Sequence, residues 1–253
     1  GRHRFSTYRN AMSSARARCC APTSAALRGL LAAAVLCLTE IAKTAPRDND
    51  AWIQAIVKIE VPIVRSVKGY PRHFLERCSA TIVSPGPFPL VMSAWHCFEG
   101  YDAMASPVTL WTESGAISLK LEASGGSMSE DWALLRSTTE WWPDTWIPAS
   151  PVRVPLGSRI SAAGFSRPPG SNADESTGDT DRILFIDSDC HVTETSSPPL
   201  ASSCVIHKGA SGGAILGRTP SGSLRVYGII SAGDSAHVSY FYPADLLSSL
   251  IRP

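Results

Sequence analysis

The sequence of 253 residues is poor in charge and lacks the patterns that define several classes of protein. Only 18% of its residues are Asp, Glu, Lys or Arg. Beyond residue 45 the net charge is −5 and no basic stripe is present, so we expect no nucleic-acid partner. The main apolar run, residues 29–39, is too short to cross a bilayer. We therefore expect no stable membrane span.

Patterns that bind metals are also missing. No Cys-x-x-Cys or paired His spacing is present, which argues against zinc, and we expect neither a metal nor an organic cofactor. Outside residues 1–45 four cysteines remain, Cys78, Cys97, Cys190 and Cys204. An even number suggests two disulfides in an exported domain. Three pairings are open, and buried free thiols are the alternative.

Residues 1–45 read as a leader rather than as part of the folded domain. They hold seven basic residues against one acid, and residues 29–39 have the length of a secretory apolar segment. We expect a signal peptide and a secreted or periplasmic protein, in which residues 46–253 form the mature domain. A retained membrane anchor and an organellar transit peptide are the alternatives.

The body is typical of short strands joined by turns. Apolar residues alternate with polar ones over residues 53–63 and again over 117–121, a period of two that predicts strands. We expect residues 69–71 to end the first strand, and further strands at 74–83, 90–92, 133–135, 159–165, 182–186, 214–216 and 224–231. Only residues 243–251 suggest a short C-terminal helix, with Pro243 in its first turn. This pattern predicts an all-β barrel architecture.

A glycine-rich turn is the strongest chemical signal. In residues 209–213, glycines flank Ser211 on both sides, so the backbone can turn sharply and expose the hydroxyl. The amides of Gly209 and Ser211 can then point into one oxyanion hole. A histidine and an acid complete the set for nucleophilic catalysis, His96 directly before Cys97 and Asp131 at the head of an apolar strand.

At this point the chain resembles the chymotrypsin/trypsin-like serine proteases, a family with a double β-barrel fold. The matching stretches cover roughly residues 51–251 and occur in the family's order: C-S-A-T-I-V-S, M-S-A-W-H-C, D-W-A-L-L, A-A-G-F, G-A-S-G-G-A-I-L and V-Y-G-I-I-S-A-G. The resemblance implies two six-stranded antiparallel barrels, about residues 51–147 and 148–253. It also implies a secreted serine endopeptidase, with Ser211 as nucleophile, His96 as general base and Asp131 as its orienting acid.

The resemblance also implies a Cys78–Cys97 disulfide. The spacing of Cys204 from Ser211 is similar to that of the bacterial secreted branch, which implies Cys190–Cys204. Ala210 stands where the family's animal members carry an Asp that pairs with a new N-terminus. We therefore do not expect activation through that ion pair.

The substrate site follows from the same resemblance. Ser231, Ala232 and Gly233 fall on the strand that pairs with the substrate backbone, and Val205 and Ile206 fall on the floor and wall of the specificity pocket. These side chains are apolar, and Asp234 is expected at the rim. We therefore expect a preference for small to medium apolar residues before the cleaved bond.

We expect the partner to be a protein or peptide substrate and the protein to be a monomer. Two alternative functions stay open: a non-catalytic or highly selective binding member of the same fold, and an esterase-type acyl hydrolase. The Gly-x-Ser-x-Gly elbow of α/β-hydrolases is formally matched by residues 209–213. That fold places its histidine after the serine and needs helices that this sequence lacks.

Overall fold

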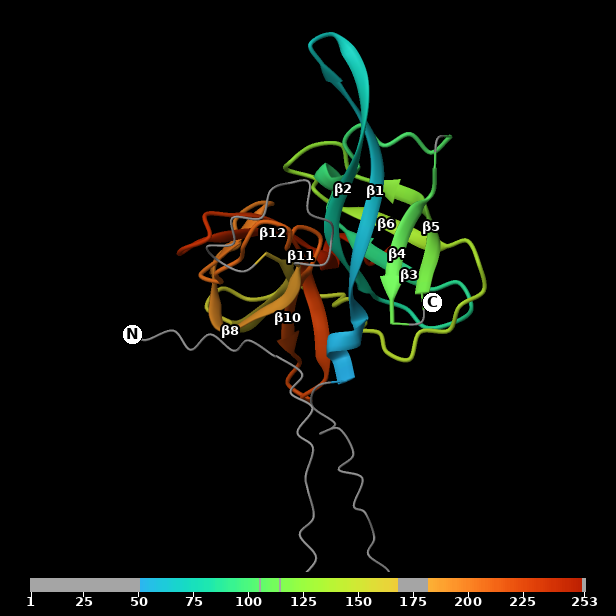
Figure 1. Ribbon diagram of the computed structural model, residues 1–253. Coiled ribbons are helices and arrows are strands. Elements are labelled where there is room, and N and C mark those ends of the chain that lie inside the picture. The colour runs from blue at the N-terminus through green and yellow to red at the C-terminus, as the bar shows by residue number, and fades with distance from the viewer. Residues whose placement is uncertain (1–50, 105, 114, 168–181, 252–253) are drawn as a thin grey trace, which may run out of the picture.

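The computed structural model describes residues 51–104, 106–113, 115–167 and 182–251 (Figure 1). The predicted leader and residues 168–181 lie outside the described residues. Within the described ranges the only helices are short 3₁₀ turns, and none of them has the length or apolarity to cross a membrane. The expected short C-terminal helix is present as a 3₁₀ turn, η4 (Ala244–Leu247), and is shorter than the nine residues predicted.

Six strands close the first barrel in the order β1-β2-β3-β6-β5-β4. They are β1 (Ile56–Val67), β2 (Tyr70–Ile82), β3 (Leu90–Ser93), β4 (Val108–Thr112), β5 (Gly115–Ser124) and β6 (Ala133–Ser137). The predicted alternation is confirmed in β1, where Ile59, Val61 and Ile63 are buried and the residues between them are half-buried. Each buried aliphatic side chain of this size stabilises the fold by about 2 kcal/mol.

The second barrel closes in the order β10-β11-β12-β9-β8-β7. Its strands are β7 (Arg159–Ser166), β8 (Ile183–Glu194), β9 (Leu200–Ser202), β10 (Ala214–Arg218), β11 (Leu224–Gly233) and β12 (Ser239–Pro243). Neighbouring strands are antiparallel throughout both barrels. The predicted fold class, an all-β protein of two six-stranded antiparallel barrels, is confirmed.

Two local expectations at the start of the domain are wrong. Residues 53–55, predicted to begin the first strand, instead belong to a 3₁₀ turn, η1 (Ala51–Ala55), and the strand begins at Ile56. The turn at residues 69–71 is shorter than expected, because the chain reverses at Lys68 and Gly69, both with positive φ, and Tyr70 already pairs with Val67. The first hairpin is therefore longer than the sequence pattern suggested, and in Figure 1 it projects beyond the barrel.

The described residues form two disulfides, one in each barrel. Cys78 is bonded to Cys97, and Cys190 is bonded to Cys204. Both predicted pairings are thereby confirmed. The first joins β2 to η2 (Trp95–Phe98), the 3₁₀ turn that carries His96. The second joins β8 to the chain that leads to residues 205–213.

Candidate active site

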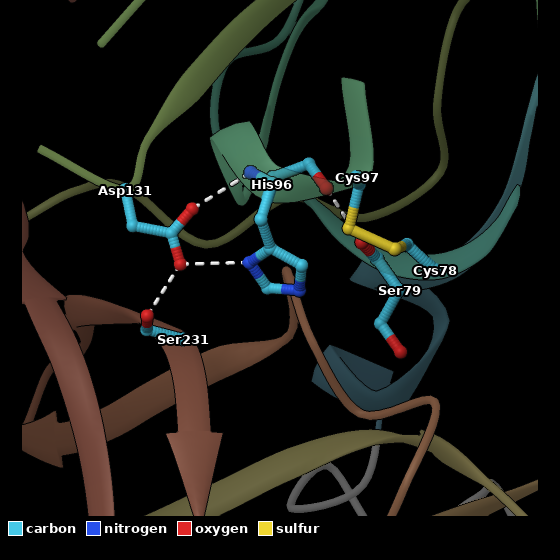
Figure 2. Close-up of polar contacts among 7 residues, drawn as sticks. Cys78, Ser79, His96, Cys97, Asp131 and Ser231 are labelled. Atoms are coloured by element: carbon cyan, nitrogen blue, oxygen red, sulfur yellow. Dashed lines mark hydrogen bonds and ion pairs between the residues drawn. A yellow bond between two sulfur atoms is a disulfide. The ribbon is translucent and has the colours of Figure 1, made fainter. Parts of the chain in front are cut away.

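The histidine and the acid come together at one end of the first barrel. His96 lies on η2, directly after β3, and Asp131 lies directly before β6, the strand that pairs with β3. The Nδ1 atom of His96 is 2.8 Å from Oδ2 of Asp131, and the backbone amide of His96 donates to Oδ1 at 2.9 Å. Figure 2 shows both contacts. The carboxylate therefore fixes the imidazole both through its ring and through its main chain.

Asp131 is almost fully buried, with 1% of its surface exposed. Burial alone would raise the pKa of its carboxyl group. The bonds from His96, together with a very short bond donated by the Ser231 hydroxyl, outweigh burial and hold this pKa below its usual range. The carboxylate therefore stays ionised at neutral pH and accepts a hydrogen bond from the Nδ1–H group of His96. In the neutral ring the free lone pair is then on Nε2.

The glycine-rich turn brings Ser211 to this pair from the second barrel. Gly212 has φ +83°, and a Cβ there would lie 2.2 Å from the Ser79 carbonyl oxygen. Only glycine permits this close approach between the barrels. The carbonyl of Ser211 accepts from the Ser79 amide at 2.8 Å, and the Gly212 amide donates to Ile230 at 2.8 Å. The turn is thus bound to both barrels.

Ser79 is a residue whose position the sequence did not reveal. Its hydroxyl accepts from the Phe165 amide at 2.8 Å and lies 3.0 Å from the Gly209 carbonyl, to which it donates. Those two partners belong to the second barrel, whereas Ser79 belongs to β2. The only sequence signal was its place directly after Cys78, inside one of the matched motifs. Ser79 links the first barrel to the turn that carries Ser211.

The amides of Gly209 and Ser211 are available for an oxyanion. Within the residues described, neither amide donates a hydrogen bond, while the Ala210 amide between them donates to the His207 carbonyl at 3.1 Å. Gly209 has φ +101°, a conformation that favours glycine. This arrangement suits two adjacent donors aimed at one developing negative charge.

Ser211 and His96 line the same cleft, which has a volume of about 790 Å³. The hydrogen bonds among the described residues do not include one from Ser211 Oγ to His96 Nε2. Contacts of this kind are often long before substrate binds. The structure therefore places the two groups at one cleft, with Asp131 behind the histidine.

None of the residues predicted for the specificity pocket belongs to the lining of this cleft. Val205 and Ile206 are buried, with 8% and 5% of their surfaces exposed. A Cβ at Gly233 would lie 2.6 Å from Cγ1 of Ile206, so this side chain occupies the space between the two predicted walls. Ala232 and Gly233 pair with β12 on one side only.

Ser231, predicted as a substrate-binding residue, turns its hydroxyl toward Asp131 instead. Figure 2 shows it on the opposite side of the His96 ring from Ser79. Asp234 lies outside the predicted floor. Its carboxylate accepts the amides of three residues, Val238, His237 and Ala236, which lower its pKa to about 2. This acid closes a tight turn between β11 and β12.

One group of possible metal ligands occurs among the described residues, formed by Cys78, His96 and Cys97. The two cysteines are joined in a disulfide and have no thiolate to offer. The chemistry available at the site is therefore that of a hydroxyl, an imidazole, a carboxylate and backbone amides.

No protein-family model and no curated protein matches the chain. Among solved structures it is similar to the Rv3671c protease of M. tuberculosis. The active form has 15% sequence identity and a TM-score of 0.54, and the match covers 79% of this chain and 80% of that one. An inactive form matches at the same identity with a TM-score of 0.51, covering 79% and 88%. The inactive form of its serine-to-alanine mutant has 15% sequence identity and a TM-score of 0.51, and the match covers 79% of this chain and 86% of that one. With its two closed six-stranded barrels, this chain has the chymotrypsin-like fold.

Proposed function

We propose that this protein is a serine endopeptidase that hydrolyses peptide bonds through an acyl-enzyme intermediate. The observation that carries the proposal is the His96–Asp131 pair, a buried and ionised carboxylate that fixes an imidazole at the cleft shared with Ser211. A hydroxyl is a weak nucleophile until a base removes its proton. Here Nε2 is the ring nitrogen free to do so.

The residues divide the reaction between them. Ser211 Oγ attacks the peptide carbonyl while His96 takes its proton, and the imidazolium that forms lies beside the Asp131 carboxylate. The oxyanion is held by the amides of Gly209 and Ser211, and each such donor is worth about 3 kcal/mol. His96 then returns the proton to the leaving amine. Water attacks the acyl group by the same steps, and Ser211 is regenerated.

We propose that the edge of β11 at Ser231–Gly233 holds the substrate backbone before the cleaved bond. The space beside it is narrow, because Ile206 lies against Gly233. The described wall residues Val205 and Ile206 offer no charge to an Arg or Lys side chain. A cation buried there without a partner would cost several kcal/mol. We therefore propose cleavage after small, uncharged residues such as Ala.

Export is part of the proposal. Two disulfides suit an oxidising compartment, and residues 1–45 have the composition of a signal segment. We propose a secreted or periplasmic enzyme.

A casein digest tests the proposal. Wild-type protein should degrade casein, and Ser211→Ala should not. Ser203→Ala is the matched control, because Ser203 lies before the turn and its hydroxyl contacts only the main chain of His191. If the protein hydrolyses esters but not peptides, and this activity depends on Ser211, the esterase alternative is favoured. If Ser211→Ala keeps the activity of the wild type, the proposed site is refuted.

A further inference from the structure

Ser79 is a fully buried residue of β2 at the point where the first barrel meets the turn that carries Ser211. Its amide donates to the carbonyl of Ser211 at 2.8 Å, and its carbonyl accepts from the Ser93 hydroxyl at 2.8 Å. Both contacts use main-chain atoms, which every amino acid except proline offers in full. They therefore do not explain why this position carries a hydroxyl.

The hydroxyl of Ser79 makes contacts of its own with the second barrel. It accepts from the Phe165 amide at 2.8 Å, and it lies 3.0 Å from the carbonyl oxygen of Gly209 and 3.4 Å from that of Phe165. A hydroxyl has one proton to donate, and the shorter distance makes Gly209 its main acceptor. No other donor to the Gly209 carbonyl occurs within the described parts of the chain. The orientation of this carbonyl therefore depends on Ser79.

The Gly209 carbonyl belongs to the peptide group that joins Gly209 to Ala210. A peptide group is planar, so its two ends turn together. The Ala210 amide at one end donates to the His207 carbonyl at 3.1 Å, and Ser79 holds the other end. Along the chain this group lies between the two amides proposed to bind an oxyanion, those of Gly209 and Ser211. Its rotation would change the angle between these two amides.

The local chain restrains this peptide group little. Gly209 has φ +101°, and glycine adopts positive and negative φ about equally readily. The turn also packs directly on the main chain of β7. A Cβ at Gly209 would lie 3.0 Å from the Phe165 carbonyl oxygen, and one at Gly164 would lie 2.9 Å from the Ala210 carbonyl oxygen. The Ser79 hydroxyl is bonded to both sides of this contact and so fixes the turn relative to β7.

The hydroxyl lies apart from the reacting groups. Ser79 does not belong to the lining of the cleft that contains His96 and Ser211. Figure 2 shows its side chain directed away from the His96 ring. Ser79 therefore acts on the site through the turn and not through contact with a substrate.

We infer that Ser79 is a positioning residue for the oxyanion hole. Its hydroxyl holds the Gly209–Ala210 peptide group so that the amides of Gly209 and Ser211 aim at one developing negative charge. The inference rests on the proposed function. Because this charge develops on the substrate oxygen only as the transition state is approached, loss of the hydroxyl should lower kcat and leave KM nearly unchanged.

Steady-state kinetics on a peptide amide test the inference, with kcat expressed per active site titrated by a fluorophosphonate probe. Ser79→Ala should lower kcat about tenfold and change KM by less than about twofold. The matched control is Ser202→Ala. Ser202 is also fully buried, and its hydroxyl contacts the Ser239 hydroxyl at 2.7 Å and the Cys204 amide at 3.3 Å. This control should lose stability but keep the wild-type kcat.

A peptidyl trifluoromethyl ketone gives a second readout. Ser211 Oγ adds to the ketone carbon while its proton passes to His96, and the ketone oxygen becomes the oxyanion of a hemiketal. Fluorine NMR measures the pKa of the hemiketal hydroxyl, which an oxyanion hole lowers. Ser79→Ala should raise this pKa by about one, the equivalent of a tenfold loss, and Ser202→Ala should leave it unchanged. A purely structural role would lower stability without moving this value.

Circular dichroism and thermal melting verify that the variants are folded. If Ser79→Ala does not fold, Ser79→Thr and Ser79→Val provide the same comparison, because both side chains are β-branched and similar in size and only threonine keeps a hydroxyl. The threonine variant should then retain more of the wild-type kcat than the valine variant. Equal kcat in these two variants would count against the inference.

Several results would overturn the inference. They are wild-type kcat in Ser79→Ala, an equal loss of kcat in Ser202→Ala, a change confined to KM, or an unchanged hemiketal pKa in Ser79→Ala. Failure of the proposed function has a different signature, because the wild type would then hydrolyse no peptide and form no hemiketal at Ser211. An active wild type with an equally active Ser79→Ala refutes the positioning role alone.

Discussion

The two barrels connect their six strands in the same order, yet they contribute to the candidate site in different ways. The first supplies side chains from positions next to strand ends: His96 after β3 and Asp131 before β6, with those strands paired to each other. The second supplies a turn, residues 209–213, whose backbone amides and hydroxyl matter most. The difference indicates that the barrels are equivalent as scaffolds and that the candidate site is complete only where they meet.

The first hairpin of the first barrel extends beyond its core. β1 and β2 stay paired up to Val67 and Tyr70, past Ile63, the last buried residue of β1. The extension adds no buried apolar surface of note, since β1 ends with three exposed residues. Ordering these residues costs conformational entropy that little core packing offsets, which points to a use outside the core.

The largest effect is expected from removing one member of the triad from either barrel. Ser211→Ala, His96→Ala and Asp131→Asn should each lower kcat/KM on a cleaved peptide about 10⁴-fold, because the three groups act as a unit. Pairwise combinations should cost little more than the single changes. Additive losses would show that the two barrels act independently and would contradict the account.

Loss of a disulfide compares the barrels directly. Replacing Cys78 and Cys97 by serine removes a crosslink between residues 19 apart in the sequence, and replacing Cys190 and Cys204 removes one between residues 14 apart. Each change should lower the free energy of unfolding by about 3 kcal/mol. The first should also lower kcat at temperatures where both variants are folded, because Cys97 adjoins His96. Urea denaturation and steady-state kinetics check the two parts. Equal kcat for the two variants would argue against a positioning role for Cys78–Cys97.

The specificity wall of the second barrel should respond to Ile206→Ala. Removing this side chain opens the space against Gly233, so kcat/KM for Phe before the bond should rise about tenfold relative to Ala. Ile160→Ala is the control, because it lies in the same core but next to Gly217 rather than Gly233. An unchanged Phe-to-Ala ratio in Ile206→Ala would place the pocket elsewhere.

The smallest effect is a pH dependence that originates in the first barrel. Because hydrogen bonds hold the pKa of Asp131 below its unfolded value, this group adds stability above about pH 4 that is lost as the pH falls through its folded pKa. The unfolding free energy of wild type minus that of Asp131→Asn should therefore decrease on acidification from about pH 6 to about pH 3. Urea denaturation at both values measures it, and a constant difference would mean that the pKa is not lowered.

The sequence anticipated the parts of the molecule in which local pattern and burial agree. Alternation in β1 and the turn around Ser211 indicated a strand and a candidate nucleophile, and the two cysteine pairings followed from the family resemblance. Strands β4, β9 and β12 were not predicted, because each has only three to five residues and none contains the run of three apolar aliphatic residues that marks β3, β6 and β10. Ser231 was assigned to the substrate edge, since nothing in its neighbours indicates that its hydroxyl meets Asp131, 100 residues earlier. Such tertiary contacts leave no period in the sequence.

The most direct test of the central claim is the site at which a fluorophosphonate probe attaches. The account predicts one adduct per chain, mapped by peptide mass spectrometry to Ser211, formed quickly in wild type and very slowly in His96→Ala and Asp131→Asn. This would show that groups from both barrels act on one hydroxyl. No adduct, an adduct on another serine, or labelling of Ser211 at the wild-type rate without His96 would contradict it.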